Sequence, residues 1–452
     1  MFSELTDRIR TFFSGNQRSV VVKKNIVYSF LIRFVSIVVS FLLVPITIGY
    51  VNADLYGVWL TLSSMMIWLG FADVGFTQGL KNKLTEAIAH NDFSRGRALV
   101  STTYFMMIVI FVPVTILLEL LVPLINWAGL LNVDDSYSTE ITEAMHVLVA
   151  FACLQMVLNV LTSVVSAFQK VALSNSFLVI ANILSLIIVY VLRLTIPPSL
   201  VALAFSIGAM PSFVMIIASL CFFNGKFKEV SPKLNNIKFE FVRDLFGLGW
   251  KFFVINIQVL VLYQSTNVLI SHVSSPADVT HYNIAYKLLS CAMMAYTIIT
   301  TPLWPAYTDA YARDDYEWMR QMRNKMQRVL LLSMCGCILL ACLSQPIYYV
   351  WVGDSVSVPY LMTFLVALYV IIYCWMTLNG TLTIGMGKLK VGTYMIIIGM
   401  ILHLPLSLYL SKFIGAYGVL TSLILINFVY AIISYIQVKR LLNHTAIGIW
   451  NE

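Results

Sequence analysis

Apolar stretches of about twenty or more residues recur along the whole chain, separated by short polar connectors. A helix of about 20 apolar residues crosses the roughly 30 Å hydrocarbon layer of a bilayer. Of the 452 residues, 60% are apolar and only 11% are charged, whereas soluble domains contain about a quarter charged residues. The sequence therefore predicts a polytopic membrane protein that leaves no room for a soluble catalytic domain.

Twelve such stretches can be placed along the chain. They cover residues 26–51, 55–79, 98–124, 142–168, 173–193, 199–223, 246–271, 281–306, 329–351, 359–384, 391–411 and 417–438. The first follows Lys23 and Lys24 and is too long for the apolar core of a signal peptide. We therefore predict an all-α fold of twelve transmembrane helices.

The positions of the basic residues predict the orientation of these helices. If the N-terminus is cytoplasmic, the cytoplasmic segments contain 24 of the 29 Lys and Arg residues, and the outer loops contain only Arg193 and Lys412. Cytoplasmic loops of membrane proteins are enriched in Lys and Arg, so both termini are predicted to be cytoplasmic. The same enrichment explains the net charge of +8, and we do not predict nucleic acid binding.

A short sequence repeat divides the chain into two halves. Residues 85–93 (TEAIAHNDF) follow the second predicted helix, and residues 308–316 (TDAYARDDY) follow the eighth. Residues 52–56 and 276–279 resemble each other in the outer turns before these two helices. Six helices form an even number, so the two copies enter the membrane in the same sense and predict a parallel repeat around a central cavity.

This repeat predicts five regions. They are a basic cytoplasmic segment (1–24), an N-terminal lobe with helices 1–6 (25–223), a cytoplasmic connector (224–245), a C-terminal lobe with helices 7–12 (246–438) and a cytoplasmic tail (439–452). The first segment is either an amphipathic helix on the inner leaflet or a simple basic tail.

Three cations within the predicted helices are candidates for substrate binding. A charge near the centre of a bilayer costs about 2.5–3.5 kcal/mol, which favours a functional role for Arg33, Lys251 and Lys287. Each could instead extend toward the membrane surface. Polar residues at helical spacing accompany these cations and predict the lining of a cavity: Ser29, Ser36, Gln155, Asn159, Asn256, Gln258 and Asn283. Such residues also form ordinary contacts between helices. A cationic cavity suits an anion such as a phosphate or pyrophosphate.

Acidic side chains within the predicted helices are few. Asp73 is a candidate charge partner for Arg33 or a coupling group, although a structural role is favoured, in which it pairs with Lys81 or caps a broken helix before Gly75. Glu119 is a candidate proton-coupling group. The seven cysteines are scattered and the six histidines lack metal-ligand spacing, so we predict no metal site and no disulfide framework. The sequence contains no Walker A, GxSxG or HExxH motif, which predicts no cofactor and no enzyme activity.

Residues near the N-terminus carry a family resemblance. The segments 45–50 (PITIGY), 55–59 (LYGVW), 73–75 (DVG) and 80–84 (LKNKL), with Trp68, resemble the start of bacterial O-antigen and capsular polysaccharide flippases. These flippases belong to the multidrug/oligosaccharidyl-lipid/polysaccharide exporter superfamily. The similarity is most specific over about residues 20–100, and the remainder agrees in helix number and topology.

The resemblance implies an inner-membrane translocase for undecaprenyl-pyrophosphate-linked oligosaccharide. It implies alternating access of two lobes, coupling to H+ or Na+ or to the membrane potential, contact with membrane lipid, and a polysaccharide polymerase and chain-length regulator as partners. Cationic side chains line the cavity in this family, and Arg33, Lys251 and Lys287 are the candidates here. Their match to family positions rests on helix number and not on a shared motif.

Two other functions are open to a chain of this composition. A multidrug or small-molecule antiporter of the same superfamily would place acidic residues in its cavity, whereas the first helix carries Arg33 and no carboxylate. A membrane glycan polymerase would need a catalytic base in a large outer loop, and the longest predicted outer loop covers only about residues 125–141. Both functions are therefore disfavoured.

Overall fold

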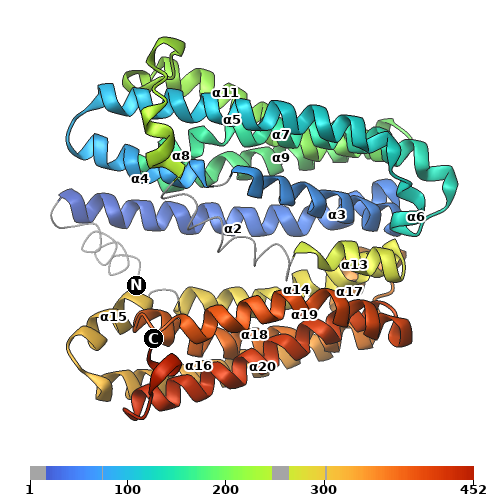
Figure 1. Ribbon diagram of the computed structural model, residues 1–452. Helices are drawn as coiled ribbons and strands as arrows, with labels where there is room; N and C mark the ends of the chain where they lie inside the picture. The colour runs from blue at the N-terminus through green and yellow to red at the C-terminus, as the bar shows by residue number, and fades with distance from the viewer. Residues whose placement is uncertain (1–16, 74, 247–263, 301–302) are drawn as a thin grey trace, which may run out of the picture. The chain divides into compact units, whose positions relative to one another are not determined.

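The computed structural model describes residues 17–73, 75–246, 264–300 and 303–452, and every regular element within these ranges is helical (Figure 1). The chain forms two compact units. The first contains Met1–Val51, Met65–Ala128 and Asp135–Ile257, and the second contains Asn52–Ser64, Gly129–Asp134 and Gln258–Glu452. Two short segments from the first half of the sequence thus belong to the second unit.

The first half of the chain forms these helices: α2 (Gln17–Val51), α3 (Ala53–Trp68), η1 (Leu69–Asp73), α4 (Phe76–Ala89), α5 (Phe93–Leu121), α6 (Trp127–Leu131), α7 (Ser138–Leu158), α8 (Val160–Ala167), α9 (Val171–Thr195), α10 (Leu200–Leu203), the π-helical turn η4 (Ala204–Ala209) and α11 (Met210–Asn224). Four short turns, η2 (Val122–Leu124), η3 (Asp135–Tyr137), η5 (Lys228–Val230) and η6 (Leu234–Asn236), lie in the connectors. Ser199 caps α10, because its hydroxyl accepts a hydrogen bond from the Ala202 amide.

The second half of the chain forms α13 (Thr266–Val273), α14 (Pro276–Thr300), α15 (Leu303–Ala312), α16 (Tyr316–Cys342), α17 (Ser344–Val352), η8 (Gly353–Ser355), α18 (Tyr360–Gly385), α19 (Lys390–Ile414), α20 (Ala416–Leu442) and η9 (Gly448–Asn451). Helix α18 lies at the centre of this half, because α14, α16 and α20 all pack against it. A buried cluster around Tyr307, Met319 and Leu382 joins α15, α16 and α18 near one end of this unit.

Nine helical segments in the described ranges are long and apolar enough to cross a membrane. The chain is therefore a multi-pass membrane protein. The predicted helix 55–79 is not among the nine, because the chain forms only 16 helical residues in α3, then the 3-10 turn η1, then α4. The helix predicted at 281–306 corresponds to α14, which carries polar residues along much of its length. The helix predicted at 246–271 lies largely outside the described residues, and the total of twelve stays a prediction.

The two repeated sequence segments fold alike. In the first, Asn91 has a φ of 56° and the Asp92 carboxylate accepts a hydrogen bond from the Arg95 amide at 2.9 Å, which caps α5. In the second, Asp314 has a φ of 55° and Asp315 caps α16 by accepting from the Trp318 amide at 3.0 Å. The turns after α4 and α15 therefore have the same conformation, while the six-helix repeat itself is not established by two turns.

Segment 52–64 packs closely against α14 in the second unit. The Thr280 hydroxyl donates to the Ala53 carbonyl oxygen at 2.7 Å. Only a glycine fits at position 57, because a Cβ there would overlap the backbone carbonyl of Pro276. A hydrogen bond also attaches segment 129–134 to α13, since the Ser271 hydroxyl donates to the Leu131 carbonyl oxygen at 2.9 Å. These two segments are thus attached to the end of α13 and the start of α14.

Candidate functional site

Helix α14 combines buried apolar residues with one polar face. Ile284, Ala285, Leu288 and Leu289 are buried against neighbouring helices. Asn283, Lys287 and Ser290 follow the spacing i, i+4, i+7 and share one face, and all three are half-buried. The Asn283 amide donates to the Asn267 side-chain oxygen of α13 at 2.9 Å and to the Val279 carbonyl at 2.8 Å. Asn283 is therefore oriented by α13, one turn before the Lys287 ammonium.

Four tyrosines form a continuous row on α14 and α18, which we call the tyrosine array. Tyr282 stacks on Tyr286 with ring centroids 5.7 Å apart, and Tyr286 lies 6.3 Å from Tyr369 of α18. Tyr369 in turn lies 6.2 Å from Tyr373. Sequence analysis missed this array, although both pairs have the i, i+4 spacing that places side chains together on a helix.

Lys287 suits an anionic group, and the two half-buried tyrosines of the array, Tyr286 and Tyr373, suit a polar, ring-containing group. An ammonium group binds phosphate oxygens by charge-assisted hydrogen bonds. Tyrosine rings provide flat apolar surfaces that end in a hydroxyl group, so they can contact both the faces and the edges of a polar ring. A role of Lys287 and Asn283 in substrate binding stays a prediction.

The other cationic candidate with a described position, Arg33, belongs to the first unit. Arg33 is exposed on α2, and Ser36, one turn further along the same helix, is half-buried. Ser29 also lies in α2, but its side chain is outside the described part of the structure. Gln155 and Asn159 are half-buried at the end of α7, where the Asn159 carbonyl accepts a hydrogen bond from Thr162. Their gathering around one cavity with Lys287 stays a prediction.

Three further candidates, Lys251, Asn256 and Gln258, lie in residues 247–263, outside the described residues. Among the described residues, no group of three or more His, Cys, Asp or Glu side chains could hold a metal ion.

Asp73 caps α4, which is one of the roles predicted for it. Gly75, with a φ of 82°, precedes this helix and has no side chain to cap it. The Asp73 carboxylate instead accepts hydrogen bonds from the Thr77 amide at 3.1 Å and from the Thr77 hydroxyl. Capping of α4 is therefore sufficient to explain the Asp73 carboxylate, and no ion pair with a basic residue is needed.

Replacing Asp73 with alanine should therefore destabilise the protein by about 1 kcal/mol, the usual cost of a lost helix cap. Asparagine, which is also a good capping residue, should restore most of that stability. Thermal unfolding of the purified variants in detergent measures both effects. An Asp73→Asn variant that is as stable as the wild type but inactive would instead indicate a charged role in coupling.

Glu119 pairs with a histidine that sequence analysis left unassigned. Its carboxylate contacts the Nδ1 atom of His146, and the pair joins α5 to α7 within the first unit. Both side chains are partly exposed, at 30% for Glu119 and 39% for His146. The pair thus places a carboxylate and an imidazole in direct contact between two membrane-spanning helices.

Comparisons with known sequences identify the family. The family described as polysaccharide biosynthesis protein matches residues 22–311, more than half of the chain. A Salmonella typhimurium protein named as an O-antigen transporter is 25% identical over 176 residues, which cover 38% of this chain and only 41% of that protein. A Salmonella typhi protein of the same name is 20% identical over 413 residues, covering 88% of this chain and 91% of the relative.

Comparisons with solved structures identify the fold. An inward-facing multidrug resistance MATE family transporter of the MOP superfamily matches with a TM-score of 0.71 at 13% identity, covering 90% of this chain and 98% of that one. A mutant of a Vibrio cholerae MATE transporter matches with a TM-score of 0.55 at 13% identity, covering 95% and 99%. At such low identity the likeness concerns the fold alone. These relatives are transporters and not enzymes.

The family match extends well beyond residues 20–100, where the resemblance to polysaccharide flippases is most specific. It includes α14 with Lys287 and ends within α15. The chain therefore belongs to the polysaccharide biosynthesis protein family, and its fold is similar to that of MATE family transporters.

Proposed function

We propose that this protein flips an undecaprenyl-pyrophosphate-linked oligosaccharide, such as an O-antigen or capsule repeat unit, from the cytoplasmic to the outer leaflet of a bacterial inner membrane. The observation that carries the proposal is the half-buried cation Lys287 on α14, a helix that also carries two of the four tyrosines of the array. The relatives named as O-antigen transporters support a lipid-linked glycan as the substrate.

Each part of this substrate has a chemical counterpart among the candidate residues. The pyrophosphate would bind Lys287, Arg33 and Lys251, because cations and phosphate oxygens form strong hydrogen bonds. The sugars would contact the half-buried Tyr286 and Tyr373 of the tyrosine array and amide side chains such as that of Asn283. These cationic residues disfavour a multidrug antiporter, because they would repel the organic cations that such a protein exports.

Transport would proceed by alternating access of two six-helix lobes, with both termini in the cytoplasm. The contacts of segment 52–64 with α14, including the hydrogen bond from Thr280 to Ala53, would close the outer end of the path in one state. They would have to separate when the substrate is released outside. The close approach at Gly57 supports this role, since it allows the two helix starts to meet tightly.

An ion gradient would drive the cycle, and the contact between Glu119 and His146 makes this pair the best candidate for proton coupling. We infer that Asp73, which caps α4, has a structural role instead. A polysaccharide polymerase and a chain-length regulator would act on the product in the outer leaflet.

Reconstitution into liposomes tests the proposal. A fluorescent lipid-linked oligosaccharide placed in one leaflet should become accessible to a quencher on the other side when the protein is present. The rate should increase with a proton gradient, and the Glu119→Gln variant should lose this increase. A protein that moves an organic cation dye but no lipid-linked oligosaccharide would contradict the proposal.

A further inference from the structure

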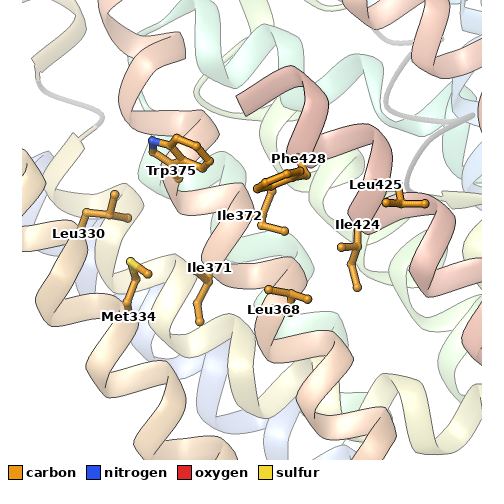
Figure 2. Close-up of a pocket in the computed structure, with 9 residues that line it drawn as sticks. All are labelled: Leu330, Met334, Leu368, Ile371, Ile372, Trp375, Ile424, Leu425 and Phe428. Atoms are coloured by element: carbon orange, nitrogen blue, oxygen red, sulfur yellow. The ribbon is translucent and has the colours of Figure 1, made fainter. Parts of the chain in front are cut away.

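An apolar groove runs along the second unit between α16 and α20, over the central helix α18 (Figure 2). Its volume is about 500 Å³. Leu330 and Met334 line it from α16, Leu368 and Ile371 from α18, and Phe428 from α20, with Trp375 at one end. All nine side chains that line the groove are apolar or aromatic. The three helices are candidate membrane spans, so the groove lies at the depth of the hydrocarbon layer.

A cation lies beyond the end of the groove that Trp375 marks. Arg323 precedes Leu330 by seven residues, which is two turns or about 10 Å along the same face of α16. Its guanidinium lies over the Tyr435 ring at 5.0 Å, and that ring is 6.2 Å from Trp375. The rings of Trp375 and Tyr435 therefore link the end of the apolar groove to the Arg323 guanidinium.

The guanidinium has unused hydrogen-bond donors. Its Nε and Nη2 atoms are buried and have no hydrogen-bond partner in the described part of the chain. Buried donors without partners are costly, and for a charged group the cost is greater. A ligand that supplies an acceptor oxygen at this place would remove that cost.

A second unused donor belongs to Tyr307 of α15. The Tyr307 hydroxyl is buried and lacks a partner among the described residues. Burial raises the pKa of Tyr307 to about 12, although the nearby Arg323 charge acts in the opposite direction. The hydroxyl therefore keeps its proton at neutral pH and can donate a hydrogen bond to an anion.

The distance from Arg323 to the far end of the groove fits one leaflet. From Arg323 to Met334 is eleven residues, or about 16 Å of helix. This is close to half of the roughly 30 Å hydrocarbon layer. A fatty acyl chain reaches the middle of the bilayer from its headgroup, whereas a polyprenyl chain of eleven isoprene units is far longer than the groove.

We propose that the apolar groove binds one acyl chain of an anionic phospholipid, whose phosphate is held by Arg323. The phospholipid belongs to the leaflet next to the start of α16, which is the cytoplasmic leaflet in the predicted topology. It is a resident lipid of the second unit and not the transported substrate. The proposal is therefore independent of the proposed function and can fail without affecting it.

Lipid binding to the full-length protein tests this directly. We would reconstitute the protein in nanodiscs of equal parts phosphatidylethanolamine and phosphatidylglycerol, then release it and count bound lipids by native mass spectrometry. The wild type should retain one phosphatidylglycerol. Arg323→Gln should weaken its retention about tenfold, because a hydrogen bond to a charged group is lost. Arg328→Gln is the matched control, since Arg328 is exposed on a different side of α16, and it should retain the lipid.

A second variant keeps the test decisive if Arg323→Gln does not fold. Ile371→Trp should fill the groove and expel the acyl chain, whereas Leu402→Trp, at an exposed position of α19 outside the groove, should not. Retention of phosphatidylglycerol by both Arg323→Gln and Ile371→Trp would overturn the proposal. Displacement of the phospholipid by an equal amount of undecaprenyl phosphate would also overturn it and assign the groove to the substrate.

Discussion

Replacing Lys287 with alanine should reduce transport of lipid-linked oligosaccharide about ten- to a hundredfold. The reason is the loss of a charge-assisted hydrogen bond to the pyrophosphate, worth about 1.5–3 kcal/mol, and each 1.4 kcal/mol is a factor of ten. Removal of both Arg33 and Lys287 should abolish transport. The rate of appearance of oligosaccharide in the outer leaflet of reconstituted liposomes measures this loss.

Two controls separate this effect from misfolding and from general loss of charge. Lys412→Ala removes an exposed cation from the last turn of α19 and should leave transport unchanged. Arg33→Lys retains the charge but loses the planar guanidinium, so it reports whether Arg33 binds by paired hydrogen bonds. Normal transport by a well-folded Arg33→Ala, Lys287→Ala double variant would exclude a cationic binding site.

Linking residue 53 to residue 280 should block transport completely. The Thr280 hydroxyl and the Ala53 carbonyl oxygen are 2.7 Å apart, so a short thiol cross-linker can join cysteines at these positions. If this contact must open once in every cycle, a covalent link arrests the protein after at most one transport event. Liposome transport before and after cleavage of a reducible cross-linker gives the measurement.

The controls for this experiment are the two single-cysteine variants, which also account for the native cysteines. Ala53→Cys and Thr280→Cys treated alone with the same reagent should stay active. Activity of the doubly substituted, fully cross-linked protein would show that segment 52–64 and α14 remain together throughout transport. The alternating-access mechanism proposed for this end of the chain would then be wrong.

Hydropathy was sufficient to predict a helical membrane protein, because backbone N–H and C=O groups within a bilayer must form hydrogen bonds with one another, and a helix allows this within one segment. It was less informative where helices are short or polar. The interruption of the second predicted helix at Gly75 depends on a local cap from Asp73, which was only one of several roles open to that carboxylate. Helix α14 is polar enough to fall outside the nine apolar spans, and this polarity is also what makes it the candidate site.

The candidate site was only partly predictable for a different reason. A single charge such as Lys287 is easily recognised within an apolar stretch of sequence, because charged residues are rare in membrane-spanning helices. Tyr369 and Tyr373 do not stand out, because aromatic residues are common in membrane helices and their role depends on contact with α14. The pairing of Glu119 with His146 likewise depends on the packing of α5 on α7, which no local pattern specifies.

The central claim is that the protein moves a lipid-linked oligosaccharide across the membrane, and the location of that lipid in cells lacking the gene tests it most directly. We predict that completed lipid-linked units accumulate on the cytoplasmic side, out of reach of a probe added to the periplasm, and that surface polysaccharide is lost. Units that the periplasmic probe can reach would place the defect at polymerisation, and an unchanged surface glycan would indicate a different transported substrate. Either result would contradict the claim.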